Sequence, residues 1–407
     1  MNILYLGHFF PQRLIENINS DSKGKIGFSN HNFEMSILTG LSKQQNLNVS
    51  AITIPSVFSF PYNNRKLFTP REKFTYKGIN VKSLGFCNLP VIKEYLGILL
   101  GAFQIIKEFK KYPKSTINII INTPSKRWLN AIRIARLFTK RKLTQTVIVP
   151  DIPALVSSMD ATNPIKRRIL YHQNQSIMVQ TSHCDGLVVL TGAMMNWFSP
   201  RPPHIVMEGI IATDKVDIYN SEIPNENTKE IILYSGTLRR IFGVMNLVKA
   251  FNLIPDMDVE LWICGSGEAA EEIEHLSKQD SRIKFFGLVD SAKAIDLQHK
   301  ATILVNPRTS EGEFTKYSFP SKTMEYLLAG KSVIINRLPG IPQEYYDYVF
   351  TPKDESVGAL AECIIEVMKM NPDIRCRKSH EGQNFVMSHK NAIVQTMRII
   401  ELIKTYN

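Results

Sequence analysis

The stretch that decides the fold runs TKYSFPSKTMEY, from Thr315 to Tyr326. Pro320 suits the first turn of a helix, because its ring fixes φ and the N–H that it lacks would find no partner there. The apolar stripe of this helix consists of Met324, Leu327 and Leu328. Lys322 and Glu325 lie three residues apart, so they share the opposite face. The segment therefore predicts a helix whose first N–H groups and lysine can hold an anion such as a diphosphate.

The residues around this helix start predict a binding loop. A strand ending at Asn306 precedes the loop, and Glu325 lies one turn inside the helix, where it can accept hydrogen bonds from sugar hydroxyls. The loop residues that we expect to contact the ligand are Lys316, Tyr317, Ser318 and Phe319. The alternative is a surface ion pair between Lys322 and Glu325 without a ligand.

Three further strand ends of the second half carry loops that suit an anionic ligand. The first reads YSGTLRRIFG over residues 234–243, and the others contain Gly-Ser-Gly at 265–267 and Gly287. Glycine allows the backbone to turn tightly and to approach a ligand, and N–H groups at a helix start attract anions. The expected ligand contacts are Gly236, Thr237, Arg239, Arg240, Gly265, Gly267 and Gly287. Each glycine could instead serve only as a turn, and the arginines could be solvated.

Short apolar runs alternate with helical patterns along most of the chain, which is typical of parallel α/β units. Expected strands include Asn2–Leu6, Val49–Ile54, Ile117–Ile121, Thr146–Val149, Glu230–Tyr234, Val259–Ile263, Thr302–Asn306 and Ser332–Ile335. We predict two Rossmann-like domains that face each other across a cleft. They comprise residues 1–205 and 206–385, and a final helix, 386–407, packs back on the first domain. Ligands of such sheets bind at the carboxyl ends of the strands.

Length and composition fit this prediction. A chain of 407 residues is long enough for two cores, and 44% hydrophobic with 21% charged residues is globular composition. The five cysteines are scattered without metal-ligand spacing, which favours reduced thiols over disulfides. We expect no signal peptide, because the first residues already resemble a strand. The longest apolar run, Tyr95–Ile106, is too short to span a bilayer.

Charge divides the chain into two unlike halves. Residues 1–205 hold 26 Lys and Arg against 9 Asp and Glu, whereas the remainder holds 23 against 28. The excess peaks in residues 101–150, with 11 basic residues and one acid, Glu108. The amino-terminal half is therefore expected to meet an anionic partner, such as a phospholipid surface or a pyrophosphate-linked acceptor. A solvated basic face is the alternative. The run Leu96–Ile106 could enter a membrane interface, although a core helix is favoured.

These motifs, in their order and spacing, resemble the carboxy-terminal domain of glycosyltransferase family 4, also called group 1. The resemblance covers about residues 230–345. In the amino-terminal half it is looser and depends on GHFFP at 7–11, GFSN at 27–30 and the order of strands. The resemblance implies the GT-B fold and a retaining transfer of a hexosyl group from a nucleotide-sugar, with UDP the favoured nucleotide. Within the family, the chain resembles capsule and O-antigen transferases.

The resemblance also implies roles for individual residues. Glu325 stands where the family has the second glutamate of its two-glutamate motif, on the nucleotide ribose. The first glutamate would lie eight residues earlier, where this chain has Tyr317, and Glu311 or Glu313 could substitute. The family's phosphate-loop Arg and Lys align with Thr237 and Phe242, so Arg239, Arg240 or Lys322 would have to neutralise the diphosphate. The implied acceptor-side residues are Gly7, His8, Gly27 and Asn30.

We predict catalytic roles for Glu325 and for Asp151, which follows a strand end as an acceptor-side group or, alternatively, caps a helix. His8 and the other histidines are favoured as packing residues. No metal or other cofactor is expected, because no Asp-x-Asp or metal-ligand pattern occurs. The expected acceptor is lipid-linked or an oligosaccharide, at the cytoplasmic face of a membrane, and no nucleic acid is expected. Two other classes stay open: a sugar-nucleotide epimerase of the same architecture, and a non-enzymatic binder of anions or nucleic acid.

Overall fold

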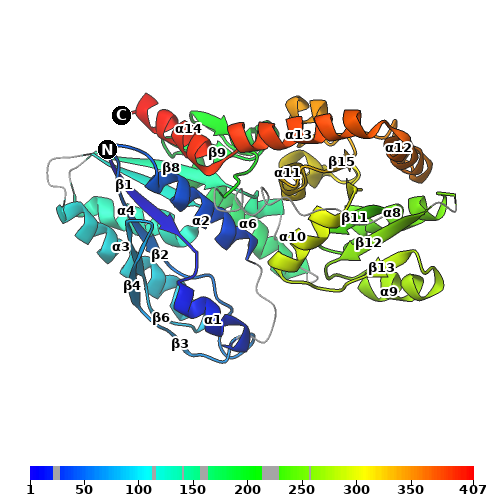
Figure 1. Ribbon diagram of the computed structural model, residues 1–407. Coiled ribbons are helices and arrows are strands. Elements are labelled where there is room, and N and C mark those ends of the chain that lie inside the picture. The colour runs from blue at the N-terminus through cyan, green and yellow to red at the C-terminus, as the bar shows by residue number, and fades with distance from the viewer. Residues whose placement is uncertain (22–27, 112–115, 140–141, 156–163, 213–228, 256–257) are drawn as a thin grey trace. The chain divides into compact units, whose positions relative to one another are not determined.

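The computed structural model describes residues 1–21, 28–111, 116–139, 142–155, 164–212, 229–255 and 258–407 (Figure 1). The chain divides into two compact units, Met1–Ala212 with Ala392–Asn407, and Thr213–Asn391. The sequence places this boundary at 205–206, seven residues before the observed position at 212–213.

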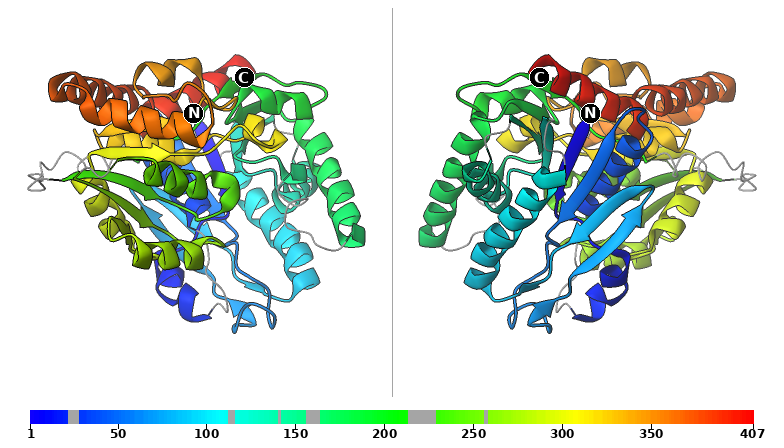
Figure 2. Two further views of the ribbon diagram at one scale, coloured as in Figure 1. Left: turned by 90° about the vertical axis from the view of Figure 1, so that its right-hand side faces the viewer. Right: turned by 90° about the vertical axis from the view of Figure 1, so that its left-hand side faces the viewer.

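The amino-terminal unit contains an eight-stranded sheet in the order β10-β9-β8-β7-β1-β2-β5-β4 (Figures 1 and 2). The strands are β1 (Asn2–Gly7), β2 (Asn48–Thr53), β4 (Glu72–Tyr76), β5 (Ile79–Ser83), β7 (Ile117–Asn122), β8 (Leu143–Val149), β9 (Gly186–Val189) and β10 (His204–Val206). All neighbours are parallel except β4, which pairs antiparallel with β5. The sequence did not predict β4 and β5, nor the small antiparallel pair β3 (Phe68–Thr69) and β6 (Phe86–Cys87).

The helices of this unit are α1 (Gln12–Asp21), α2 (Ser29–Ser42), α3 (Pro90–Lys111), α4 (Lys126–Leu137), α6 (Pro164–Ser182), the 3-10 helix η1 (Gly192–Trp197) and α14 (Ala392–Thr405). α2 and α14 pack together against one face of the sheet, in a core that contains Ile37, Leu38, Ile399 and Ile403. α3 and α4 lie side by side (Figure 1). Right-handed crossovers place them on the other face, because β7 lies on the opposite side of β1 from β2.

The second unit is a five-stranded parallel sheet in the order β13-β12-β11-β14-β15. Its strands are β11 (Glu230–Ser235), β12 (Val259–Cys264), β13 (Ile283–Phe285), β14 (Ile303–Asn306) and β15 (Ser332–Ile335). The helices are α8 (Val244–Asn252), α9 (Ala270–Gln279), α10 (Ser291–Lys300), α11 (Ser321–Leu328), α12 (Val357–Lys369) and α13 (Pro372–His389). Short 3-10 turns are η2 (Arg240–Phe242), η3 (Glu313–Tyr317) and η4 (Gln343–Asp347). The strands are apolar because both faces of a parallel sheet are covered.

The strands expected from the sequence are present, with bounds that differ by a few residues. Helices α1, α6, α12 and α13 were not predicted. The order of strands in both units puts β1 and β11 at positions where the chain reverses its direction across the sheet. In open α/β sheets these reversal points, at the carboxyl ends of the strands, are where ligands bind. In each unit, a ligand site is therefore expected at the reversal point of the sheet, at the carboxyl ends of the strands.

Close packing of α14 on α2 depends on Gly40. A β-carbon at this position would lie 2.1 Å from the carbonyl oxygen of Ala392. We expect Gly40→Ala to destabilise the amino-terminal unit by about 1–3 kcal/mol, because the two helices would have to move apart. Urea unfolding followed by the fluorescence of buried Trp128, with Trp197 and Trp262 replaced by Phe, would measure this. Gly192→Ala is the matched control, since nothing lies within 4 Å of its added carbon; an equal loss in both variants would contradict the packing argument.

Candidate active site

The loop after β11 lies directly against the loop after β14. It continues through Gly236 and η2 to Gly243, whose φ of 77° is left-handed, and α8 begins at the next residue. A β-carbon on Gly243 would lie 2.1 Å from the carbonyl oxygen of Pro307. Only glycine satisfies both the backbone angle and this contact. Two of the segments expected to bind the ligand are therefore neighbours in the fold.

The glycine loops after β12 and β13 join the same edge. Gly265 has a φ of 143°, and a β-carbon there would lie 1.8 Å from the carbonyl oxygen of Gly236. Its N–H donates to the carbonyl of Gly287 at 2.7 Å. The N–H of Leu238 donates to the carbonyl of Ser266 at 2.9 Å. The loops after β11, β12 and β13 thus form one hydrogen-bonded rim.

Two glycines of this rim differ in what constrains them. A β-carbon on Gly267 would lie 2.4 Å from the carbonyl oxygen of Leu238, so the position is closed to larger residues. Gly287 has a left-handed φ of 62° but open space around it. Gly267 therefore serves packing between the loops, and Gly287 leaves the backbone of its loop accessible.

Helix α11 is tied to the end of β11 by Tyr326. The fully buried phenol accepts a hydrogen bond from the N–H of Ser235 at 2.9 Å and donates to the carbonyl of Ser235 at 3.2 Å. Burial raises the pKa of Tyr326 far above its usual value, so the phenol stays protonated. This contact holds the second turn of α11 against the end of β11, where the loop 236–243 begins.

Lys322 and Glu325 share one face of α11, as expected, and they form the ion pair that was the alternative to a ligand contact. The ammonium of Lys322 lies 2.6 Å from Oε2 of Glu325, and each side chain is about one third exposed, at 35% and 34%. The stripe of Met324, Leu327 and Leu328 is buried on the opposite side. Pro320 is the N-cap and not the first helical residue, and no side chain caps this helix start in the described structure. Its first N–H groups are available to an anion.

Arg308 was not among the predicted site residues, yet it is the cation at the centre of this edge. It follows β14 and is only 8% exposed. Its Nη2 donates to Oγ of Ser318 at 2.7 Å, and its Cζ lies 5.4 Å from the ring centroid of Phe242 and 4.7 Å from that of Phe314. Its buried Nε has no hydrogen-bond partner, and none of the described carboxylates pairs with it. A buried cation without a counter-charge is costly unless an anion binds.

The two arginines predicted from the loop sequence have different surroundings. Arg240 is exposed and forms an ion pair with Glu272 of α9, and its N–H donates to Oε1 of Glu268 at 3.0 Å. Arg239 is also exposed, and its Cζ lies 5.7 Å from the ring centroid of Phe242. Arg239 and Arg308 therefore converge on one ring, whereas Arg240 is already neutralised.

The remaining predicted donor-side residues differ in how far their side chains are exposed. Thr237 is exposed, and its carbonyl accepts a hydrogen bond from Tyr234 at 2.8 Å. Lys316 is exposed and Tyr317 is half-buried. The ring of Phe319 packs inside the unit, 5.2 Å from the ring of Tyr345. Phe319, a predicted ligand contact, has its side chain in the core, so that only its backbone remains available.

In the amino-terminal unit, the loop after β1 is organised by a buried carboxyl group that the sequence did not reveal. Oε1 of Glu34 accepts the N–H of His8 at 3.0 Å, and Oε2 accepts the hydroxyl of Tyr5 at 3.2 Å. A β-carbon on Gly7 would lie 2.0 Å from Oε2, which explains the glycine. Glu34 is completely buried within α2. Its only sequence signal is a single acid on an apolar helical face.

Asn30 extends this network. Its Nδ2 donates to Oε1 of Glu34 at 3.2 Å, and its Oδ1 accepts a hydrogen bond from Asn122 at 3.1 Å. Thr123, next along the chain, has a left-handed φ of 67°, a strained conformation that is typical of functional loops. Gly27, the other predicted acceptor-side glycine, lies outside the described residues. The loops after β1 and β7 therefore meet in a polar cluster at the reversal point of the sheet.

His8 is a neutral hydrogen-bonding group. Its Nδ1 lies 3.0 Å from the carbonyl oxygen of Ile54, which can only accept, so Nδ1 carries the proton and Nε2 is an acceptor. Burial and the nearby charge of Arg127 lower the pKa of His8 to about 4. Arg127 itself pairs with Glu94. Asp151, the other predicted catalytic residue, follows β8 and is exposed.

Glu34 gives the amino-terminal unit a pH dependence that can be measured. Burial raises the pKa of Glu34 to about 8, whereas in the unfolded chain the carboxyl group ionises near its ordinary pKa of 4.5. The folded state therefore binds the proton more tightly, and the stability contributed by Glu34 is lost as pH rises from about 4.5 to 8. We expect the free energy of unfolding of Glu34→Gln, relative to the native chain, to increase across this range. His8 contributes equally to both proteins, so parallel pH profiles would contradict the shift.

Part of the chain matches a known protein family. Residues 229–370 match the family described as glycosyl transferases group 1. No curated protein matches the sequence. Sucrose-phosphate synthase from Thermosynechococcus elongatus has a similar structure, with a TM-score of 0.61, 14% identity and coverage of 100% of this chain and 99% of that one.

Two further solved structures extend the comparison. The lipopolysaccharide outer core galactosyltransferase WaaB has a TM-score of 0.61 at 14% identity, covering 100% and 99% of the two chains. Anabaena Alr3699/HepE in complex with UDP and glucose has a TM-score of 0.59 at 15% identity, covering 100% of both. The chain therefore shares the GT-B fold of these solved structures, and residues 229–370 are similar to the group 1 glycosyltransferases.

Proposed function

We propose that this chain transfers a hexosyl group from a nucleotide-sugar, with UDP as the nucleotide, to a hydroxyl of a lipid-linked or polysaccharide acceptor, with retention of configuration as in family 4. The product class is a bacterial surface polysaccharide of the capsule or O-antigen kind. The observation that carries the proposal is the buried guanidinium of Arg308, which no described carboxylate neutralises, at the strand edge where four loops meet.

The donor diphosphate is assigned to this edge. Arg308 and Arg239 supply positive charge around Phe242, and the uncapped start of α11 supplies backbone N–H groups. The resemblance aligns Thr237 and Phe242 with the basic residues of the phosphate loop in family 4. In this chain Arg308 brings a cation over Phe242 from the neighbouring strand, and thereby replaces the missing charge.

Glu325 is assigned to the ribose of the nucleotide. Its carboxylate is paired with Lys322 at 2.6 Å, and both side chains are partly exposed. When the donor binds, the ammonium of Lys322 would turn to a phosphate oxygen and leave the carboxylate to accept ribose hydroxyls. Tyr317 occupies the position of the first family glutamate, and its phenol can donate to a sugar hydroxyl, as a carboxylate cannot.

The chemistry needs charge stabilisation on the departing diphosphate. Positioned N–H groups and cations stabilise such charge by several kcal/mol in a site shielded from water. In a front-face transfer the sugar–phosphate bond breaks as the acceptor oxygen attacks the same face. A diphosphate oxygen then takes the acceptor proton, so the protein needs no nucleophile. We expect the reaction to require no metal, since Arg308, Arg239 and Lys322 supply the positive charge.

The amino-terminal unit is assigned to the acceptor. Asn30 and His8 offer neutral hydrogen-bonding groups at the reversal point of its sheet, and such groups recognise sugar hydroxyls. Asp151 stays an acceptor-side proposal, as does the placement of the protein on the inner face of a membrane. The excess of basic residues in this half supports an anionic, lipid-linked acceptor in place of a neutral one.

Nucleotide binding tests the assignment of Arg308. In a thermal-shift titration we expect UDP at about 100 times its dissociation constant to stabilise the native chain by about 2.7 kcal/mol. Arg308→Gln should weaken UDP binding by about 10- to 100-fold, the value of a hydrogen bond to a charged group. Its melting temperature without ligand should not fall, because an uncompensated buried charge is removed.

Arg375→Gln is the matched control for this experiment. Arg375 is also largely buried in the same unit, but it pairs with Glu230 at 3.2 Å. We expect this variant to lose stability and to keep its affinity for UDP. Unchanged UDP affinity in Arg308→Gln would remove the phosphate assignment.

Turnover tests the assignment of Glu325. Glu325→Ala should reduce kcat/KM for sugar transfer by about 100-fold or more with the fold intact, since a charged hydrogen bond to the donor is lost. Transfer from labelled UDP-sugars to a membrane extract would measure this. Lys278→Ala breaks another helical surface pair, with Glu274 at 3.1 Å, and should leave turnover unchanged. Native activity in Glu325→Ala would refute the assignment.

A further inference from the structure

Helix α3 presents a bare apolar face to solvent. Five large apolar residues on it are exposed, at 68% for Val91, 48% for Ile92, 65% for Tyr95, 60% for Leu99 and 52% for Phe103. Four of them, at 91, 95, 99 and 103, follow each other at intervals of four residues, which is nearly one helical turn. An apolar surface that continues over several turns is typical of an interaction site.

The opposite face of α3 makes the packing contacts. Ile98, Ala102 and Ile105 are buried there, and a β-carbon on Gly101 would lie 3.1 Å from the ring of Trp128 on α4. The sequence favoured a core helix for Leu96–Ile106, and this is correct for the inner face alone. Since the outer face contributes nothing to the core, its apolar residues need another explanation.

Basic residues continue the outer face toward the end of the helix. Lys107, Lys110 and Lys111 are all exposed, and the ammonium of Lys107 lies 4.4 Å from the ring centroid of Phe103. The two acids of α3 are neutralised: Glu94 pairs with Arg127, and Glu108 pairs with two lysines. The outer face is therefore apolar over three turns and positive at its carboxyl end.

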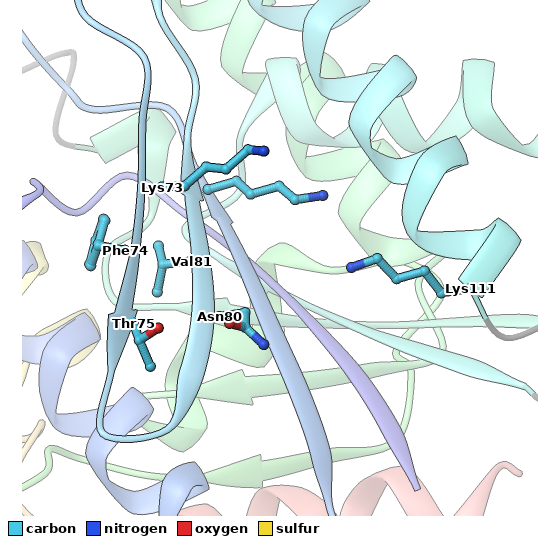
Figure 3. Close-up of a pocket in the computed structure, with 7 residues that line it drawn as sticks. Lys73, Phe74, Thr75, Asn80, Val81 and Lys111 are labelled. Atoms are coloured by element: carbon cyan, nitrogen blue, oxygen red, sulfur yellow. The ribbon is translucent and has the colours of Figure 1, made fainter.

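A hollow of about 320 Å³ adjoins this positive end. It is lined by Lys73, Phe74, Thr75, Asn80, Val81, Lys82 and Lys111. Figure 3 shows the ammonium groups of Lys73 and Lys111 pointing into the same space from β4 and from the end of α3. Of the hollow's three lysines, Lys82 and Lys111 pair with the buried carboxylate of Glu108 and lower its pKa, although burial opposes the shift. The hollow is left with net positive charge.

We infer that the outer face of α3 docks on an anionic phospholipid bilayer. Val91, Ile92, Tyr95, Leu99 and Phe103 enter the interfacial layer. Lys107, Lys110 and the lysines of the hollow meet phosphate oxygens of the headgroups. Aromatic and aliphatic side chains beside lysines suit the interface between acyl chains and headgroups. The helix lies on the membrane, since none of the described helices has the length and apolar composition to cross one.

Charge favours a bilayer over a second copy of the chain. Two copies joined in parallel through this face would bring their positive ends near each other, at an electrostatic cost, and in an antiparallel pair each positive end would lie on apolar turns of the other copy without a counter-charge. An anionic leaflet supplies the opposite charge over its whole surface, and docking on it requires no complementary shape. The inference extends the membrane part of the proposed function, but it does not depend on sugar transfer, because vesicle binding is measured without any donor.

Flotation with lipid vesicles tests the apolar face. The full chain should float with vesicles of phosphatidylcholine and phosphatidylglycerol, and far less with phosphatidylcholine alone. Leu99→Ser with Phe103→Ser should lower the partition coefficient by about tenfold or more for each side chain. Leu253→Ser with Ile374→Ser removes two apolar residues that are similarly exposed, at 59% and 49%, in the other unit, and should bind as the native chain does.

Substitution of lysines tests the charged end. Lys107→Gln with Lys110→Gln should reduce binding to the anionic vesicles by about fivefold for each residue and weaken its salt dependence. UDP affinity, measured in parallel, should be unchanged in every variant, so that loss of docking is distinguished from failure of the donor site. The inference is overturned if the native chain does not float, or if the serine variant floats equally well. A dimer that dissociates on Phe103→Ser would also overturn it.

Discussion

The site of the carboxy-terminal unit depends on one constraint: all five strands of its sheet run parallel, so their carboxyl ends lie along one edge. Side chains and loops that are far apart in the sequence therefore meet there. Tyr326 fixes α11 to the end of β11 through two hydrogen bonds to Ser235, and Gly243 and Gly265 allow neighbouring loops to touch. Without these close approaches the helix start and the cations would not share a site.

Charge within this edge is distributed unevenly between two arginines. Arg240 is neutralised by Glu272, whereas Arg308 is buried with aromatic rings and a serine as its partners. A protein tolerates an uncompensated buried cation when a bound anion repays the desolvation. The hydroxyl of Ser318 holds the guanidinium of Arg308 in place by a hydrogen bond and, because it is neutral, leaves the positive charge intact.

The amino-terminal unit differs from the carboxy-terminal unit, because the groups at the reversal point of its sheet are neutral. Glu34 organises the loop after β1 from inside the protein, and burial keeps both Glu34 and His8 uncharged near neutral pH. Hydrogen bonding without net charge suits hydroxyl groups. A cluster of positive charge in this unit lies at the surface of α3 and β4, where it is suited to a charged interface.

The alternation of strands and helices, the division into two α/β units and the shared face of Lys322 and Glu325 could all be predicted from the sequence, because periodicity and glycine placement are local properties. It did not reveal Arg308 or Glu34 as site residues, since nothing local distinguishes a buried, unneutralised charge from a solvated one. Burial is a property of the packed chain. For the same reason the sequence could not separate Arg239 from Arg240, place the ring of Phe319 in the core, or show that one face of α3 is bare. Those differences depend on which neighbours the tertiary structure brings to each side chain.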